Sequence, residues 1–182
     1  MFCAEDVVDI YQHLRNNNIP IWLTGGWGID ALLGEQTRPH KDLDVFVLLD
    51  DILRMCTLLE QDGYTLKELW EENCPAVDTF GNRTDTAFVL QDPQGRELDI
   101  HAMRLDEAGN GLPVWRESEG FIIKKQDLAR EGSIARFSVQ CISPEMQMIC
   151  HTGYEVPEKQ LHDLELLHDK FGVETPWHRN KL

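Results

Sequence analysis

Two aspartates separated by one residue, Asp42 and Asp44, lie in an otherwise apolar stretch. If this stretch is a β-strand, both carboxylates share one face, while Leu43 and Val45 share the other. Two carboxylates on one face repel each other and lose hydration, so a cation must offset their charge. A lysine or arginine partner would suffice, but Mg²⁺ prefers carboxylate oxygens and also bridges substrate phosphates. The pair is therefore a candidate metal site for phosphate chemistry.

A double glycine, Gly25-Gly26, precedes this acidic stretch and separates an apolar segment from one with helical periodicity. Without a Cβ in the way, backbone amides at a helix N-terminus can approach a phosphate closely. A tight turn between a strand and a helix would also explain two glycines, but the position just before the acidic strand favours phosphate binding. The surrounding sequence matches neither the Walker pattern nor Gly-x-Gly-x-x-Gly, so P-loop and Rossmann folds are not expected.

A third carboxylate, Asp99, lies in a later apolar segment, where it is expected to share a strand face with His101. Two-metal nucleotidyl transfer requires two carboxylates that bridge the ions and a third that holds or deprotonates the attacking hydroxyl. Asp99 completes that number if its strand neighbours the strand of Asp42 and Asp44. His101 fits either a catalytic role or that of a hydrogen-bonded neighbour, and we favour the neighbour.

The elements expected to position these residues mix helices and strands. Helical periodicity and capping signals predict helices at 5–17, 27–33, 50–61, 144–151 and 157–171. Apolar or alternating runs predict strands at 19–24, 42–49, 64–70, 84–91, 96–103, 121–125 and 137–142, with a loop at 105–116. This order predicts an α+β fold in which helices flank a mixed sheet. One domain is expected over 1–182, with a core at about 1–105 and a C-terminal helical part at about 143–175.

The net charge and the composition limit the classes of molecule that this protein is expected to bind. The 182 residues include 32 acidic and 17 basic side chains, a net charge of −15. Because nucleic-acid binding normally requires a basic surface, no nucleic-acid partner is expected. A nucleotide would need divalent cations to approach such a protein. A cationic acceptor would also be favoured, although solubility alone explains the charge equally well.

The expected compartment is the cytoplasm. Five scattered cysteines without a Cys-x-x-Cys motif indicate reduced thiols rather than a disulfide framework or a zinc site. The first residues lack the basic and apolar regions of a secretory signal, and no apolar run has the length of a membrane span. A membrane partner is therefore not expected.

The residues from Gly25 to Gly34 and from Thr37 to Asp44 resemble the DNA polymerase β-type nucleotidyltransferase superfamily. Within it, they are most similar to the aminoglycoside 2''-O- and lincosamide nucleotidyltransferases. The shared pattern is a Gly-Gly-Trp turn, an Arg-x-His pair, Asp-x-Asp and a later strand aspartate, here Asp99. The resemblance is dense over 19–50 and returns around Asp99.

This resemblance implies a polymerase β-like fold and a reaction. A nucleoside monophosphate, AMP from ATP, would pass to a hydroxyl of a small acceptor of the aminoglycoside or lincosamide type. Gly25 and Gly26 would contact the nucleotide phosphates. Asp42 and Asp44 would bind two Mg²⁺ ions, and Asp99 would be the third ligand or the general base.

Other residues are weaker candidates. Arg38 and His40 are expected beside the triphosphate, with surface charge of the loop as an equal alternative. His101, His151 and Tyr154 are candidates for the acceptor pocket, although packing and capping would also explain the last two. The segments 70–80 and 105–121 match nothing in the resemblance and are expected to shape the acceptor pocket.

Two rival functions remain at this stage. The enzyme could instead modify a protein or a tRNA, as toxin–antitoxin nucleotidyltransferases do, but the lack of a basic surface argues against tRNA. A non-catalytic nucleotide-binding module is the second rival, and the presence of all three carboxylates argues against it. The acceptor, the preferred base and the oligomeric state stay open, with a homodimer among the assemblies considered.

Overall fold

The computed structural model describes residues 1–152 and 157–175, apart from the side chain of residue 159. Helices form where periodicity and caps predict them. In chain order they are α1 (Ala4–Asn16), α2 (Gly25–Leu33), the 3-10 turn η1 (Leu49–Asp51), α3 (Ile52–Gln61), α4 (Lys125–Leu128), α5 (Pro144–Cys150) and α6 (Glu158–Phe171).

The strands form one large sheet and one small one. They are β1 (Ile21–Thr24), β2 (Asp42–Leu48), β3 (Thr65–Leu69), β4 (Ala76–Val77), β5 (Arg83–Thr84), β6 (Ala87–Gln91), β7 (Glu97–Leu105), β8 (Gly111–Pro113), β9 (Arg130–Ile134) and β10 (Phe137–Cys141). The large sheet has the order β3-β6-β7-β2-β1-β10-β9, and β8 also pairs with β7; β4 and β5 pair separately.

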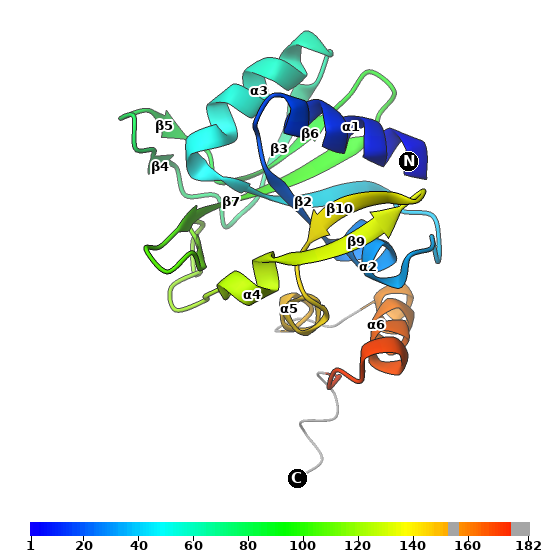
Figure 1. The fold of residues 1–182 in the computed structure, drawn as a ribbon. Helices are drawn as coiled ribbons and strands as arrows, with labels where there is room; N and C mark the ends of the chain where they lie inside the picture. The colour runs from blue at the N-terminus through cyan, green and yellow to red at the C-terminus, as the bar shows by residue number, and fades with distance from the viewer. Residues whose placement is uncertain (153–156, 176–182) are drawn as a thin grey trace.

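The large sheet is mixed and has helices on both sides, as expected for an α+β fold (Figure 1). The β1–β10 and β2–β7 pairs are parallel, and the β1–β2 and β6–β7 pairs are antiparallel. In Figure 1, α1 and α3 lie on one side of the sheet, and α2, α5 and α6 lie on the other. The acidic strand β2 thus runs through the middle of the sheet, between β1 and β7.

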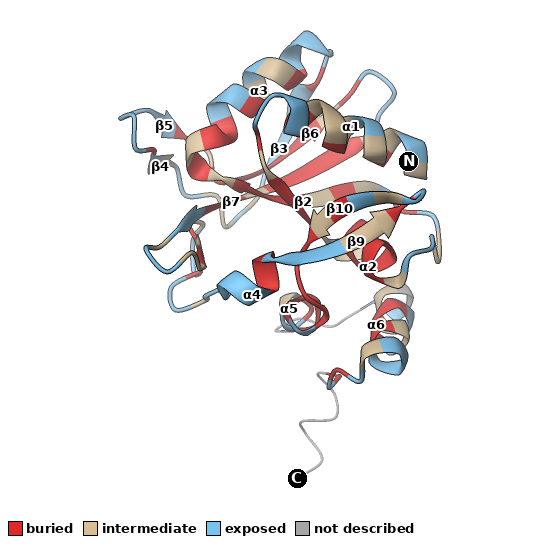
Figure 2. Ribbon diagram, in the orientation of Figure 1, coloured by how far each residue is buried: buried red, intermediate tan, exposed pale blue. Residues whose placement is uncertain are grey.

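Buried apolar side chains form the core. The buried positions, red in Figure 2, run along the central strands and the helices packed on them. Helix α3 buries Ile52, Met55 and Leu59, a spacing of three and four residues that puts them on one face. Strand β2 buries Leu43, Val45 and Val47, which alternate with the aspartates as the sequence predicts. Removing these side chains from water supplies the main driving force for folding.

The C-terminal helices begin and end at the predicted signals. The Ser143 hydroxyl accepts a hydrogen bond from the backbone N–H of Met146, and Pro144 occupies the first turn of α5. Helix α6 ends at Gly172, which adopts the left-handed conformation with φ of +69°.

Several predicted elements need correction. The segment 105–116 contains β8 rather than loop alone, and the strand predicted at 121–125 is a single bridge at Ile123 followed by α4. The predicted strand 84–91 is divided between β5 and β6. Helix α2 begins at Gly25, two residues earlier than expected. Strand β9 was not predicted, and with β10 it carries the sheet past residue 105.

Among the described helices, none combines the length and the apolar character that crossing a bilayer requires.

The contact between β9 and α2 gives a test of the fold. A Cβ added to Gly132 would lie 2.5 Å from the carbonyl carbon of Ala31, so Gly132→Ala must push the strand and the helix apart. We expect a loss of about 1–3 kcal/mol in the free energy of unfolding, measured by urea denaturation. Ser138→Ala, at an exposed position of β10, is the control. A Gly132→Ala midpoint equal to that of Ser138→Ala would contradict this packing.

Candidate active site

The parallel pairing of β2 with β7 brings the three predicted carboxylates together. Asp44 is paired in register with Asp99, and Asp42 lies opposite Glu97. Residues paired in register point to the same face of a sheet. The expectation that the two acidic strands are neighbours is therefore confirmed, and Asp42, Asp44 and Asp99 share one face.

The start of α2 packs directly against this face. Gly25 adopts φ of +57°, and a Cβ on it would overlap the carboxylate of Asp44. A Cβ on Gly26 would overlap the ring of His40 in the same way. The two glycines are thus required by close approach as well as by the turn. The first N–H groups of α2, which have no partner within the helix, begin at this point.

The negative charge of the carboxylate face is only partly compensated, by His101 beside Asp99. Burial and the carboxylates of Asp99 and Asp42 raise the pKa of Asp44 well above its usual range. Within the described ranges, no lysine or arginine forms an ion pair with Asp42 or Asp44. The simple lysine or arginine partner considered from the sequence is therefore not found there.

The donor set fits a divalent cation only in part. Asp42 and Asp44 offer carboxylate oxygens on one face, the ligand type that Mg²⁺ prefers. In the portion of the chain that the structure describes, however, no three His, Cys, Asp or Glu side chains converge closely enough to hold an ion. Asp42 and Asp44 thus fit the role of ligands, whereas Asp99 is engaged with other partners.

Asp99 is the centre of a hydrogen-bonded chain. Its Oδ1 accepts a hydrogen bond from Trp70 Nε1 at 2.9 Å and lies 3.3 Å from His101 Nδ1. His101 Nε2 in turn lies 3.2 Å from Glu72 Oε1. Burial alone would lower the pKa of His101, but the hydrogen bonds to Asp99 and Glu72 outweigh it and raise the pKa to about 9. A histidine cation therefore stands beside Asp99 at neutral pH.

A cavity of about 550 Å³ opens beside these groups. Of the predicted site residues, those lining it are Gly25, Gly26, Arg38, His40, Asp42, Asp44, His101 and His151. Asp99 lies next to the cavity, joined to His101, without lining it. Tyr154 falls outside the described residues.

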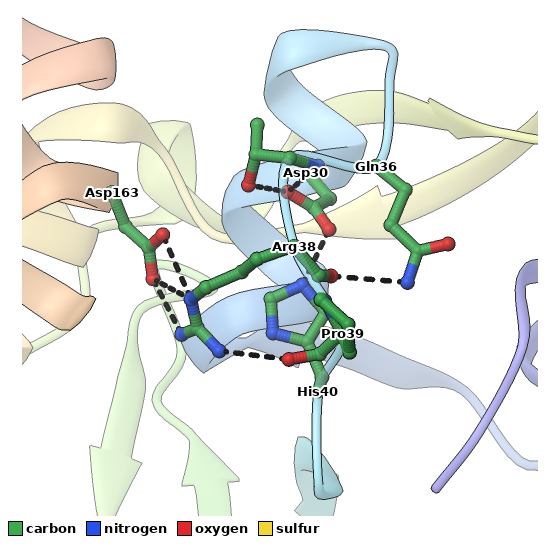
Figure 3. Close-up of polar contacts among 7 residues, drawn as sticks. Asp30, Gln36, Arg38, Pro39, His40 and Asp163 are labelled. Carbon is green, nitrogen blue, oxygen red and sulfur yellow. Dashed lines mark hydrogen bonds and ion pairs between the residues drawn. The ribbon is translucent and has the colours of Figure 1, made fainter.

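Arg38 and His40 are both held by buried carboxylates (Figure 3). Arg38 Nε donates to both oxygens of Asp163 in α6, at 3.0 Å each. His40 Nε2 bonds Asp30 in α2, whose other oxygen accepts from the hydroxyl of Thr37 at 2.7 Å. These contacts fix the loop 34–41 between α2 and α6. A contact of Arg38 or His40 with a triphosphate stays a prediction.

Aromatic side chains continue the cavity wall beyond the carboxylates, since Phe46 shares their face of β2. Phe46 of β2 stacks on Trp115, with ring centroids 5.8 Å apart and planes 7° from parallel. The edge of Trp115 also meets His101, with centroids 4.9 Å apart. Glu117, which lines the same cavity, adopts φ of +63°, an unusual conformation for a residue other than glycine.

The site includes residues that sequence reasoning missed. Trp70 was predicted only as the last residue of the strand 64–70, yet its indole reaches Asp99. Glu72 and Trp115 gave no signal, because both act through contacts with distant residues. Of the two segments expected to shape the pocket, 105–121 lines the cavity, whereas 70–80 reaches only Asp99 and His101 behind it.

His151 ends α5 at the cavity wall. It is buried, its Nδ1 donates to the Gln147 carbonyl at 2.8 Å, and burial lowers its pKa. It is therefore neutral at physiological pH. This bond supports the packing and capping role considered from the sequence, while a contact with the acceptor stays a prediction.

Comparison with known proteins points to one family. The family model for aminoglycoside-2''-adenylyltransferase matches residues 6–167. Over 161 residues the chain is 26% identical to a lincosamide resistance protein of Staphylococcus haemolyticus, covering 88% of this chain and 89% of that protein. A 28-residue stretch, 15% of this chain and 16% of the other, is 57% identical to a 2''-aminoglycoside nucleotidyltransferase of Escherichia coli.

Solved structures agree with this match. The lincosamide antibiotic adenylyltransferase LnuA, with lincomycin bound, superposes with a TM-score of 0.72 at 26% identity, covering 90% of this chain and 94% of that one. ANT(2'')-Ia in complex with adenylyl-2''-tobramycin superposes with a TM-score of 0.70 at 20% identity, covering 93% and 89%, and supports the fold alone. Since the family model spans nearly the whole chain, the protein belongs to the aminoglycoside-2''-adenylyltransferase family of nucleotidyltransferases.

Proposed function

We propose that this enzyme transfers AMP from ATP to a hydroxyl of a small antibiotic-like acceptor, with Mg²⁺ bound by Asp42 and Asp44. The observation that carries the proposal is the sheet face that Asp42 and Asp44 share with Asp99 beside the glycine turn, where Asp42 and Asp44 line a cavity. Among the described residues Asp42 and Asp44 have no lysine or arginine partner, which suits them to metal-bound phosphates rather than to a structural role.

Each residue of the site has its own role in the proposed reaction. When bound, Mg²⁺ would neutralise charge on the phosphates and lower the pKa of the acceptor hydroxyl. Asp99 accepts the hydroxyl proton as the acceptor oxygen bonds to the α-phosphorus and pyrophosphate leaves. Trp70 and His101 both hold Oδ1 of Asp99, which leaves Oδ2 available for that proton. Gly25 and Gly26 let the phosphates approach the start of α2.

The aromatic wall bears on the choice of acceptor. The stacked rings of Phe46 and Trp115 offer an apolar surface, and Phe121 and Ile149 line the same cavity. A polycationic aminoglycoside would be attracted to the carboxylates of the lining, but in our proposal Mg²⁺ occupies Asp42 and Asp44 and leaves Glu117. The wall therefore supports a lincosamide-type acceptor, which carries fewer charges and has an apolar face.

Several broader assignments belong to the same proposal. We place the reaction in the cytoplasm because it consumes ATP and all five cysteines are free. We treat the chain as one catalytic domain because the central sheet and the helices α5 and α6 line the same cavity.

A homodimer stays a prediction. Neither the family match nor the relatives favour modification of a protein or tRNA, or a non-catalytic module.

The first test identifies the product. The enzyme is incubated with ATP, Mg²⁺ and either lincosamides or aminoglycosides, and mass spectrometry follows adenylylated acceptor. We expect a lincosamide to gain AMP in step with pyrophosphate release. An adenylylated aminoglycoside without a lincosamide product would overturn the acceptor assignment, and no product from either class would overturn the proposed function.

The second test separates catalysis from stability. Asp42→Asn or Asp44→Asn should abolish transfer. In EDTA, either substitution should leave the melting temperature unchanged or raise it, because the lost charge relieves repulsion among the three carboxylates. Asp9→Asn, at an exposed position of α1, controls for the substitution itself. A fall of several degrees in either site variant would mean that the carboxylates serve as structural partners of a cation.

The third test concerns the general base. Asp99→Asn should keep ATP affinity within about tenfold, or roughly 1.4 kcal/mol, and lower turnover by about 10²–10⁴. Trp70→Phe and His101→Ala should lower turnover by less, since each removes only a partner of Asp99. Near-normal turnover in Asp99→Asn together with an inactive His101→Ala would show instead that the histidine is the base.

A further inference from the structure

Two basic side chains that line the cavity, Arg38 and His40, are firmly held. Asp163, the partner of Arg38, has a side chain only 1% exposed, and Asp30, the partner of His40, is 2% exposed (Figure 3). If Arg38 turned toward a ligand, the buried Asp163 carboxylate would lose its counterion, which is strongly destabilising, and if His40 turned, the buried Asp30 carboxylate would lose a hydrogen-bond partner. Both side chains are therefore fixed parts of the wall.

Lys41 is held differently. Its Nζ lies 2.9 Å from Oε2 of Glu97, while Oε1 of the same carboxylate lies 2.6 Å from Nζ of Lys67. Glu97 thus keeps a positive partner when Lys41 leaves. The Lys41 side chain is 64% exposed, against 33% for Lys67, so its movement is also less hindered.

The position of Lys41 suits a ligand at the carboxylate face. Lys41 lines the cavity and directly precedes Asp42, whereas Lys67 lies on β3, at the edge of the sheet, and does not line the cavity. A lysine is a compact charge on a flexible stem, which suits contact with a phosphate that arrives and leaves. With a net charge of −15, the protein has few other means of attracting a polyphosphate.

We propose that Lys41 exchanges Glu97 for the terminal phosphates of the nucleotide, and that it holds the pyrophosphate until release. Lys67 neutralises Glu97 during the exchange. This inference rests on the proposed function. It moves the phosphate-binding role expected of Arg38 and His40 to a neighbouring residue, and it leaves those two as supports of the loop.

Binding measurements without an acceptor test the exchange. Calorimetry with Mg²⁺ present would compare ATP, inorganic pyrophosphate and adenosine on the wild type, Lys41→Gln and Lys67→Gln. Each variant removes one of the two partners of Glu97, so the pair is matched. We expect Lys41→Gln to weaken ATP and pyrophosphate by about tenfold or more while adenosine binds as before, because one charged contact is lost. Lys67→Gln should weaken both ligands by less than Lys41→Gln does, because Glu97 then holds Lys41 more firmly but the lysine that contacts the phosphates is still present.

A third variant and the wild type show whether a negative result contradicts the role of Lys41 or the proposed function as a whole. Lys41→Arg, which keeps the charge, should restore most of the affinity for pyrophosphate. Equal affinities in Lys41→Gln and Lys67→Gln, whether reduced or normal, would overturn the assignment of Lys41 while leaving the proposed function intact. If the wild type binds neither ATP nor pyrophosphate, the proposed function fails together with the inference.

Discussion

The rest of the site depends on the parallel pairing of β2 with β7. This register puts Asp44 beside Asp99 on one face, and the turn at Gly25 closes over the Asp44 carboxylate. Bringing like charges together in a partly buried place is unfavourable without a cation. The sheet is built from apolar residues on its other face, so the core supplies the stability that holds this arrangement in place.

The charges around this face are paired in two different ways. Buried carboxylates, Asp30 and Asp163, fix His40 and Arg38 and so fix the loop that carries the chain into β2. At the rim, Glu97 is shared by two lysines, one of which can leave without exposing an unpaired charge. A rigid wall and a movable cation therefore lie within a few residues of Asp42. That combination suits a site that must bind a highly charged substrate and then release a charged product.

The sequence predicted the parts of the site that depend on local rules. Alternation along a strand placed Asp42 and Asp44 on one face, and capping rules placed Ser143 and Gly172 at helix ends. Strand β9 escaped prediction because it is an edge strand in which Ile134 is the one buried residue, so it has no apolar alternation.

Contacts between distant residues were beyond the reach of local rules. Trp70 and Asp99 are 29 positions apart, and Arg38 and Asp163 are 125 apart. Arg38 and His40 were expected at the phosphates because of their place in the loop. The contact of His40 with Asp30 forms when the loop folds back on α2, and the contact of Arg38 with Asp163 forms when α6 packs beside the loop. Neither aspartate has a local sequence feature that marks it as a partner.

The central claim is that the carboxylate face exists to hold a divalent cation. Titration of Mn²⁺, followed by electron paramagnetic resonance with ATP present, tests it most directly. The account predicts that the protein takes up Mn²⁺ with a change in its spectrum, and that the double variant Asp42→Asn, Asp44→Asn loses this uptake while remaining folded. Equal Mn²⁺ uptake by the wild type and the folded double variant would contradict it.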